Sequence, residues 1–135
     1  MKKILILLFS ILISFNSLGE VVLYCTDELH TGFKYKNNKW SEVSFVRKRH
    51  TIKFNDDYSK LMGITYQDWD CTDTYRDKSY NSIFCVAPYE NGRTFSYHKD
   101  TKRYILIDGT TDAYIENVSG EKGTDNFRAG SCQNF

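Results

Sequence analysis

Hydrophobic and polar residues alternate with a period of two along much of this 135-residue chain, and no segment after residue 19 has helical spacing. Successive side chains of a β-strand point to opposite faces, so this alternation predicts strands with one buried face. Residues 94–98 are the clearest case, because Phe95 and Tyr97 face one way and their neighbours face the other. The pattern therefore predicts an all-β protein.

Turn signals separate the predicted strands. The Asn-Gly pair at 91–92 can adopt the positive φ angles of a type I′ turn, which would join strand 82–89 to strand 93–98. Glu90 would then lie opposite Arg93 as a cross-strand ion pair.

Further turns are predicted at residues 37–38, 55–57, 99–102 and 108–109. The remaining strands are expected at residues 21–25, 33–36, 40–46, 50–54, 61–66, 103–108, 110–117 and 127–132. This many short strands predict a small antiparallel β-barrel or compact sandwich built from meander hairpins.

Two predicted strands, 82–87 and 103–108, are apolar on both faces. Such strands need cover on both sides, from a second sheet layer, a loop or a partner.

The first nineteen residues predict a secretory signal peptide, because Lys2 and Lys3 precede an apolar run at 4–15 and small residues at 17–19. The run is shorter than the ~20 residues of a membrane span. We expect a signal peptide at 1–19, a single β domain at 20–135, and a periplasmic or secreted bacterial protein. An uncleaved leader remains the alternative, and it would be the only membrane contact.

Removal of the leader takes away two lysines and no acid, so the remaining domain is close to neutral. Such a charge gives no electrostatic reason to expect nucleic acid as a partner. The basic run at 47–50 is interpreted as a solvated turn or edge.

All four cysteines follow the leader, and an even number in an exported chain predicts two disulfides with three possible connectivities. We favour Cys25–Cys132, which would join the first and last strands of a closed sheet. The second pair is then Cys71–Cys85, which closes a loop of roughly 15 residues and is worth ~3 kcal/mol in the chain-entropy account.

The segment DWDCTDTYRDKSYN, residues 68–81, is predicted to be a long loop without secondary structure. Loops of this length are uncommon in compact domains and often carry function. Its candidate binding residues are Trp69, Asp70, Asp73, Tyr75, Arg76 and Tyr80. In the structural alternative, Trp69 and one tyrosine pack onto the core while Cys71–Cys85 restrains the loop.

Catalytic and metal-binding motifs are missing from the sequence. The acids of 68–81 lack the spacing of an EF-hand loop, and His30, His50 and His98 do not have zinc-ligand spacing. The chain contains neither a nucleophile elbow nor a phosphate-binding glycine loop. We therefore expect no metal, no cofactor and no catalysis.

The leading functional hypothesis is an exported binding module that uses loop 68–81 to hold a protein, a peptide or a glycan. One alternative is a cell-envelope-directed inhibitor or small hydrolase, which would need Asp70 or Asp73 near His98. A third is an assembly role for strands 82–87 and 103–108.

Several segments resemble a family of small exported β-rich bacterial proteins, namely LYCTDE, KFNDDYSKL, IFCV, TKRYI and GSCQNF. That resemblance implies export and a β-rich domain. More loosely, Tyr24 and Cys25 near the start and Cys132 near the end are similar to the membrane-bound inhibitors of C-type lysozyme, which are small periplasmic barrels. The Ser-x-Gly-x-Tyr type motif of their inhibitory loop is missing, so no inhibitory residue is carried over.

Overall fold

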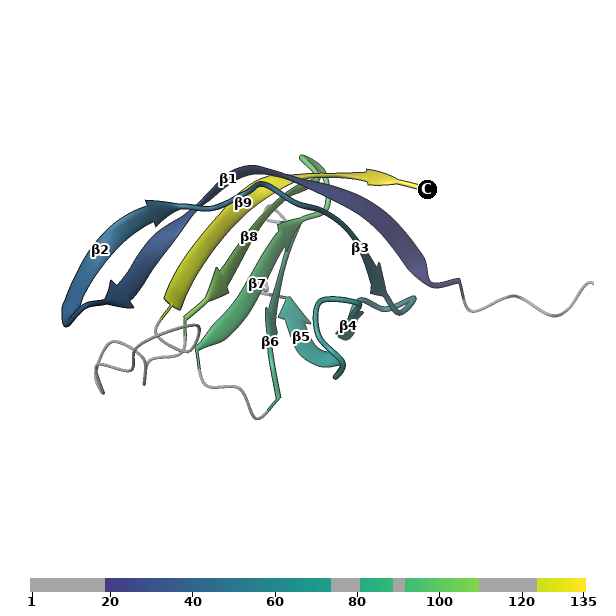
Figure 1. Cartoon of the computed structure of the whole chain (residues 1–135). Coiled ribbons are helices and arrows are strands. Elements are labelled where there is room, and N and C mark those ends of the chain that lie inside the picture. Colours follow the sequence, from purple (N-terminus) through teal and green to yellow (C-terminus); the bar gives the residue numbers. More distant parts are fainter. Residues whose placement is uncertain (1–18, 74–80, 89–91, 110–123) are drawn as a thin grey trace, which may run out of the picture.

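The computed structural model describes residues 19–73, 81–88, 92–109 and 124–135, which contain nine strands and no helix (Figure 1). No segment of that part is therefore a helix long and apolar enough to span a bilayer. The strands are β1 (Val21–Lys36), β2 (Lys39–Ser44), β3 (Arg49–Phe54), β4 (Lys60–Met62), β5 (Trp69–Asp73), β6 (Ser82–Val86), β7 (Arg93–His98), β8 (Arg103–Asp108) and β9 (Thr124–Asn134).

The strands form a closed antiparallel barrel. The sheet order is β2-β1-β3-β4-β5-β6-β7-β8-β9, and β9 also pairs with β1, so eight strands close the barrel and β2 is an additional strand. The first part of β1 pairs with β3 and its last part with β2, while its other edge pairs with β9. The predicted all-β barrel is confirmed.

The long strand β1 contains a β-bulge opposite β9. Asp27 lies opposite Gly130 and Leu29 opposite Ala129, so Glu28 has no partner across the ladder. A bulge of this kind bends its strand and re-aims the side chains around it.

The core fills the barrel interior with the buried side chains of the alternating strands. The largest fully buried residues are Trp69, Tyr97, Phe54, Phe95, Leu23, Ile52, Leu61 and Ile83. Both predicted disulfides are confirmed. Cys25 and Cys132 lie directly opposite each other on β1 and β9, as do Cys71 and Cys85 on β5 and β6.

Three of the predicted turns are confirmed. The turn at 55–57 joins β3 to β4, where the Tyr58 amide donates to the Asn55 carbonyl at 3.1 Å. Asn37 and Asn38 have φ angles of 54° and 58° and join β1 to β2, as a type I′ hairpin requires. Residues 99–102 join β7 to β8, where the Lys102 amide donates to the His98 carbonyl.

The predicted register of the β6–β7 hairpin is wrong. Val86 lies opposite Thr94, and the Ala87 amide donates to the Arg93 carbonyl, so Arg93 does not face residue 90. Residues directly opposite each other share one face of a sheet. A pairing of 90 with 93 would place Cys85 opposite the outward His98 and pull its sulfur out of the core.

Other predicted bounds also change. Residues 69–73 form strand β5 and not a loop, because Trp69 and Cys71 face the core. The strand expected at 61–66 shortens to β4, which ends before Gly63 at φ 92°. The strand expected at 110–117 and the leader at 1–18 lie outside the described residues.

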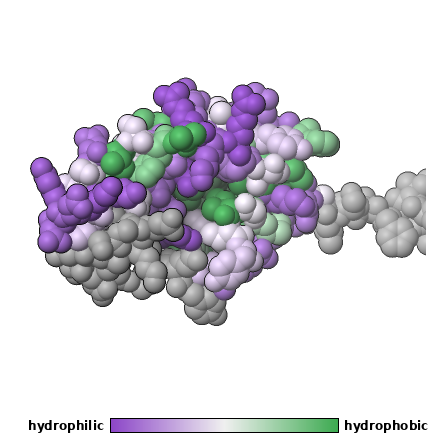
Figure 2. Space-filling view, in the orientation of Figure 1, coloured by the Kyte–Doolittle hydropathy of each residue, from purple (hydrophilic) through white to green (hydrophobic). Residues whose placement is uncertain are grey.

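The two strands predicted to be apolar on both faces remain uncovered on the outside. Val86, Ile105 and Ile107 are each more than 40% exposed, at 42%, 42% and 44%. A closed barrel is a single layer, so its outward side chains stay at the surface. Figure 2 shows one face of the molecule, where hydrophobic side chains form small groups among hydrophilic ones.

Candidate functional site

The described residues of segment 68–81 do not form a joint binding surface. Trp69 is completely buried, and its indole nitrogen donates to the Thr65 hydroxyl at 2.9 Å. Trp69 is therefore a core residue, which corrects its assignment as a contact residue and matches the structural alternative.

Asp70 and Asp73, the two acids among the candidate binding residues, point to different sides of β5. Asp70 is exposed and pairs with Lys60, with 2.5 Å between Oδ1 and Nζ, and this pairing raises the pKa of Lys60. Asp73 lines a small hollow that also includes Lys99 and Tyr58. Tyr75, Arg76 and Tyr80 lie outside the described residues, so the loop hypothesis remains a prediction.

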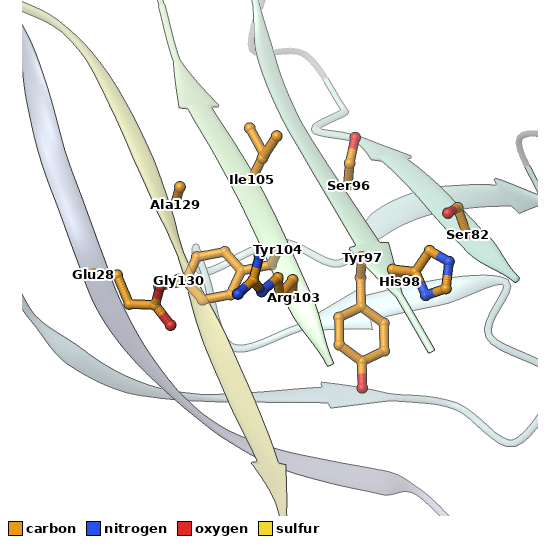
Figure 3. A pocket seen from close by; sticks show the side chains of 10 residues that line it. All are labelled: Glu28, Ser82, Ser96, Tyr97, His98, Arg103, Tyr104, Ile105, Ala129 and Gly130. Carbon is orange, nitrogen blue, oxygen red and sulfur yellow. The ribbon is translucent and has the colours of Figure 1, made fainter. Parts of the chain in front are cut away.

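A larger pocket lies on the outer face of strands β6 to β9, with a volume of about 390 Å³. Figure 3 shows Ser96, Ile105 and Ala129 on the outer side of their strands, while the Tyr97 ring points to the other side. We call this the outer pocket. It is lined by Glu28, Ser82, Ser96, Tyr97, His98, Arg103, Tyr104, Ile105, Ala129 and Gly130.

The outer pocket contains groups of opposite charge as well as a histidine. Arg103 and His98 stand at β8 and β7, and Glu28 comes from the bulge of β1 (Figure 3). His98 Nδ1 accepts hydrogen bonds from the Asp100 and Thr101 amides, each at 3.3 Å. Because Nδ1 is the acceptor, the other ring nitrogen, Nε2, carries the proton and is a donor.

A buried polar group occupies the barrel interior beneath this wall. Asp27 has a fully buried carboxylate that accepts from the Tyr104 hydroxyl at 2.5 Å and from the Lys48 amide at 2.9 Å. Burial and this hydrogen bond raise the pKa of Tyr104. His30 Nδ1 lies 4.0 Å from Asp27 and donates to the Val46 carbonyl at 2.8 Å.

His50 completes this group, which we call the Asp27 cluster (Asp27, His30, His50 and Tyr104). His50 Nδ1 lies 3.9 Å from an Asp27 oxygen, and neither ring nitrogen has a hydrogen-bond partner within the described residues. Burial lowers the pKa of His50, Asp27 opposes this change, and Arg128 adds to it.

A second cavity, of about 160 Å³, lies at one end of the barrel. Strands β7 and β9 begin and β8 ends at that end (Figure 1). We call it the mouth cavity, and it is lined by Ile64, Thr65, Trp69, Arg93, Leu106, Asp108 and Arg128. Arg93 Nε pairs with Asp108 Oδ1 at 2.5 Å, and Asn126 donates to the other Asp108 oxygen at 3.4 Å. Arg128 Nε donates to Asn126 Oδ1 at 3.3 Å.

The arrangement that a small hydrolase would need is not assembled. His98 faces outward from β7, whereas Asp73 shares the inward face of Cys71. Asp70 does face outward, but it lies level with Thr94, four residues or roughly 13 Å along the strand from His98. Neither carboxylate is within hydrogen-bond reach of the imidazole. Among the described residues, no three metal-binding side chains gather into a site.

Sequence reasoning missed Asp27, Arg128 and the polar barrel end. The signal was available for Arg128, because counting back in twos from the inward Cys132 reaches Gly130 and then Arg128. An arginine in an inward position predicts a polar interior.

Fold and disulfides define the chain as a small, disulfide-bonded antiparallel β-barrel protein. Comparison with protein-family models, curated proteins and solved structures gave no significant match. The two resemblances drawn from sequence segments therefore remain expectations.

Proposed function

We propose that this protein is an exported binding module that holds an extended peptide segment of a partner protein in the outer pocket. The observation that carries the proposal is the outer pocket itself, about 390 Å³ in volume, on the wall of a closed barrel. Strand pairing holds β6 to β9 together, and the Cys71–Cys85 disulfide ties β6 to β5, so a partner would bind a preformed surface.

The dimensions of the outer pocket favour an extended chain. Neighbouring strands lie ~4.8 Å apart, so the outer pocket measures roughly 14 Å across the strands from β6 to β9. About four residues of extended peptide cover that distance at ~3.3 Å per residue. The small side chains at 82, 96 and 129 leave the floor open for a main chain.

The charged groups of the outer pocket favour a segment that carries both an acid and a base. Arg103 and the Nε2–H of His98 are donors for a carboxylate or a carbonyl, whereas Glu28 suits a lysine or arginine. Ile105, which stands between Ser96 and Ala129, supplies apolar contact in the same pocket (Figure 3). Exposed and partly exposed charges at a rim give orientation more than affinity.

Export is part of the proposal. Two disulfides are consistent with an oxidising compartment such as the periplasm or the extracellular space. Together with the leader pattern at 1–19, they support secretion into that compartment. N-terminal mass analysis of the protein from fractionated cells tests this step, and an uncleaved cytoplasmic chain would contradict it.

The binding experiment is selection of displayed linear peptides on the disulfide-bonded domain, followed by affinity measurement against two variants. Ser96→Tyr fills the floor of the outer pocket from an outward position and leaves the core untouched. Thr94→Tyr makes the same change two residues away on the same strand, outside the pocket lining. We expect selected peptides to lose at least tenfold in affinity for Ser96→Tyr and to bind Thr94→Tyr normally.

Equal affinity of the peptides for both tyrosine variants would refute the outer pocket as the binding site. If Arg76→Ala instead abolished binding, the peptide site would belong to segment 68–81. The inhibitor alternative predicts loss of C-type lysozyme activity on addition of the domain, which a turbidity assay measures directly.

A further inference from the structure

The guanidinium of Arg128 lines the mouth cavity and has no ion-pair partner among the described residues. Its backbone lies opposite the buried Leu106, and it shares the inward face of β9 with Cys132, so its side chain enters the barrel. It is near enough to His50 and Tyr104 to lower the pKa of each through its charge. Within the described part of the chain, no carboxylate forms an ion pair with it.

The neighbouring acids are occupied by other groups. Asp108 uses one oxygen for Arg93 and the other for Asn126. Asp27 uses its oxygens for Tyr104 and the Lys48 amide. The Nε of Arg128 is fixed by Asn126, which leaves the two terminal amino groups of the guanidinium as donors without a partner in the described residues.

We propose that the mouth cavity is a binding site for a small oxyanion, held by the terminal amino groups of Arg128. An arginine fork matches the two oxygens of a carboxylate or a phosphoryl group and binds them through paired, charge-assisted hydrogen bonds. Trp69, Ile64 and Leu106 supply an apolar wall that suits a short carbon chain behind the anionic head.

The size and protection of the cavity fit such a ligand. A volume of about 160 Å³ corresponds to roughly five water molecules at ~30 Å³ each, so the site has room for a small organic acid or a phosphate ion. Positive charge held in a partly buried cavity is worth more to an anion than the same charge in open solvent. The site is separate from the outer pocket and shares no lining residue with it.

Titration of the disulfide-bonded domain with sodium acetate and with sodium phosphate, followed by NMR, tests the proposal. The readouts are the Trp69 indole N–H, which borders the cavity, and the Arg128 Nε–H. The chain has two tryptophans, Trp40 and Trp69, so the indole signal that remains in Trp40→Phe belongs to Trp69. Sodium chloride at matched ionic strength is the reference.

We expect saturable shifts at both groups with acetate or phosphate and none with chloride. Saturation by acetate identifies a carboxylate site, and saturation by phosphate identifies a phosphoryl site. Arg128→Gln should weaken binding at least tenfold. Arg128→Lys keeps the positive charge but lacks the forked guanidinium, so its affinity for the anion should lie between those of the wild type and Arg128→Gln.

Arg47→Gln is the matched control, since it removes an arginine from the surface run at 47–50 and should leave binding unchanged. Shifts that follow ionic strength alone, or equal affinity in the wild type and Arg128→Gln, would overturn the proposal. If Arg128→Gln does not fold, Arg128→Lys and the chloride reference decide the question.

Discussion

Asp27 carries a charged group into the interior of the barrel. Its carboxylate is fully buried, and it accepts hydrogen bonds from a tyrosine hydroxyl and a backbone amide. Hydrogen bonds to a charged acceptor are stronger than those between neutral groups, and a buried charge without them is costly. The bulge next to Asp27 and its partner Tyr104 therefore depend on each other.

Replacement of Asp27 by asparagine should lower the free energy of unfolding by about 1.5–3 kcal/mol, since it removes the charged acceptor of Tyr104. Tyr104→Phe should be destabilising as well, because it leaves an Asp27 oxygen without its donor. Urea unfolding of both variants and of the double variant measures the coupling. Strictly additive effects would show that the two groups do not interact.

His50 should make the stability of the barrel dependent on pH. Its pKa in the folded protein is below its ordinary value of 6.5, chiefly because of burial. The unfolded chain therefore takes up a proton first as the pH falls below 6.5, and the free energy of unfolding decreases until the folded pKa is reached. Above pH 6.5 the contribution is fully present.

Urea unfolding at pH 7.5 and pH 5.5 measures this dependence. His50→Gln should show a smaller loss between the two values than the wild type. The outward His98→Gln serves as the comparison, and it should retain the wild-type loss. An unchanged pH dependence in His50→Gln would mean that other groups cause it.

At the level of residues, the sequence predicted the disulfide partners but not the polar interior. Cysteine pairing could be argued from export and position, because each pair lies on adjacent strands. A search for hydrophobic alternation missed Asp27 and Arg128, since each is a charged residue in an inward position; Arg128 is reached only by counting in twos from Cys132. Trp69 was assigned to a loop because the many polar residues of 68–81 outweighed the short alternation of Trp69 and Cys71 with Asp68 and Asp70.

At the level of elements, β1 and β9 approach each other more closely than a side chain would permit. A Cβ atom on Gly130 would lie 2.1 Å from the Thr26 carbonyl oxygen and 2.8 Å from the Tyr104 ring. The backbone oxygen cannot turn away, so the ladder would have to separate. The glycine is required by the spacing of the two strands.

Gly130→Ala should therefore destabilise the protein by roughly 1–3 kcal/mol, the usual cost of overpacking. Gly109→Ala is the matched control, because the nearest atom to its added Cβ would be 3.8 Å away. Thermal unfolding compares the two variants. A Gly130→Ala protein as stable as Gly109→Ala would mean that the two strands lie further apart than described.

Element prediction succeeded where the interior is apolar and failed where it is polar. Strands β3 and β7 were found from their alternation and β8 from its apolar run between two turns. The middle of β1 was missed because Asp27 and His30 occupy its inward positions. The hairpin between β6 and β7 was given the wrong register because the Asn-Gly signal was followed in place of the face of Cys85.

At the level of the whole molecule, the two disulfides differ in what they close. Cys25–Cys132 joins residues 107 apart and seals the barrel between its first and last strands, whereas Cys71–Cys85 spans 14 residues within one hairpin. In the chain-entropy account these closures are worth about 4.7 and ~3 kcal/mol respectively.

Replacement of Cys25 and Cys132 by alanine should consequently cost more stability than the same change at Cys71 and Cys85. Urea unfolding of the two double variants gives both values under one set of conditions. An equal or reversed order would show that strain or residual structure in the unfolded chain outweighs loop length.

The pairing of β1 with β9 also determines how the barrel would be presented from a tether. Leu23 lies opposite Asn134, so the first and last strands of the barrel have these ends on the same side. Asn126, at the mouth, comes eight residues earlier in β9, roughly 26 Å away along the strand. A fusion partner or surface linkage attached before β1 or after β9, or an uncleaved leader before β1, would therefore leave the mouth cavity at the opposite end of the barrel from the attachment point. The same adjacency of the ends favours a circular permutant reopened at residues 99–102.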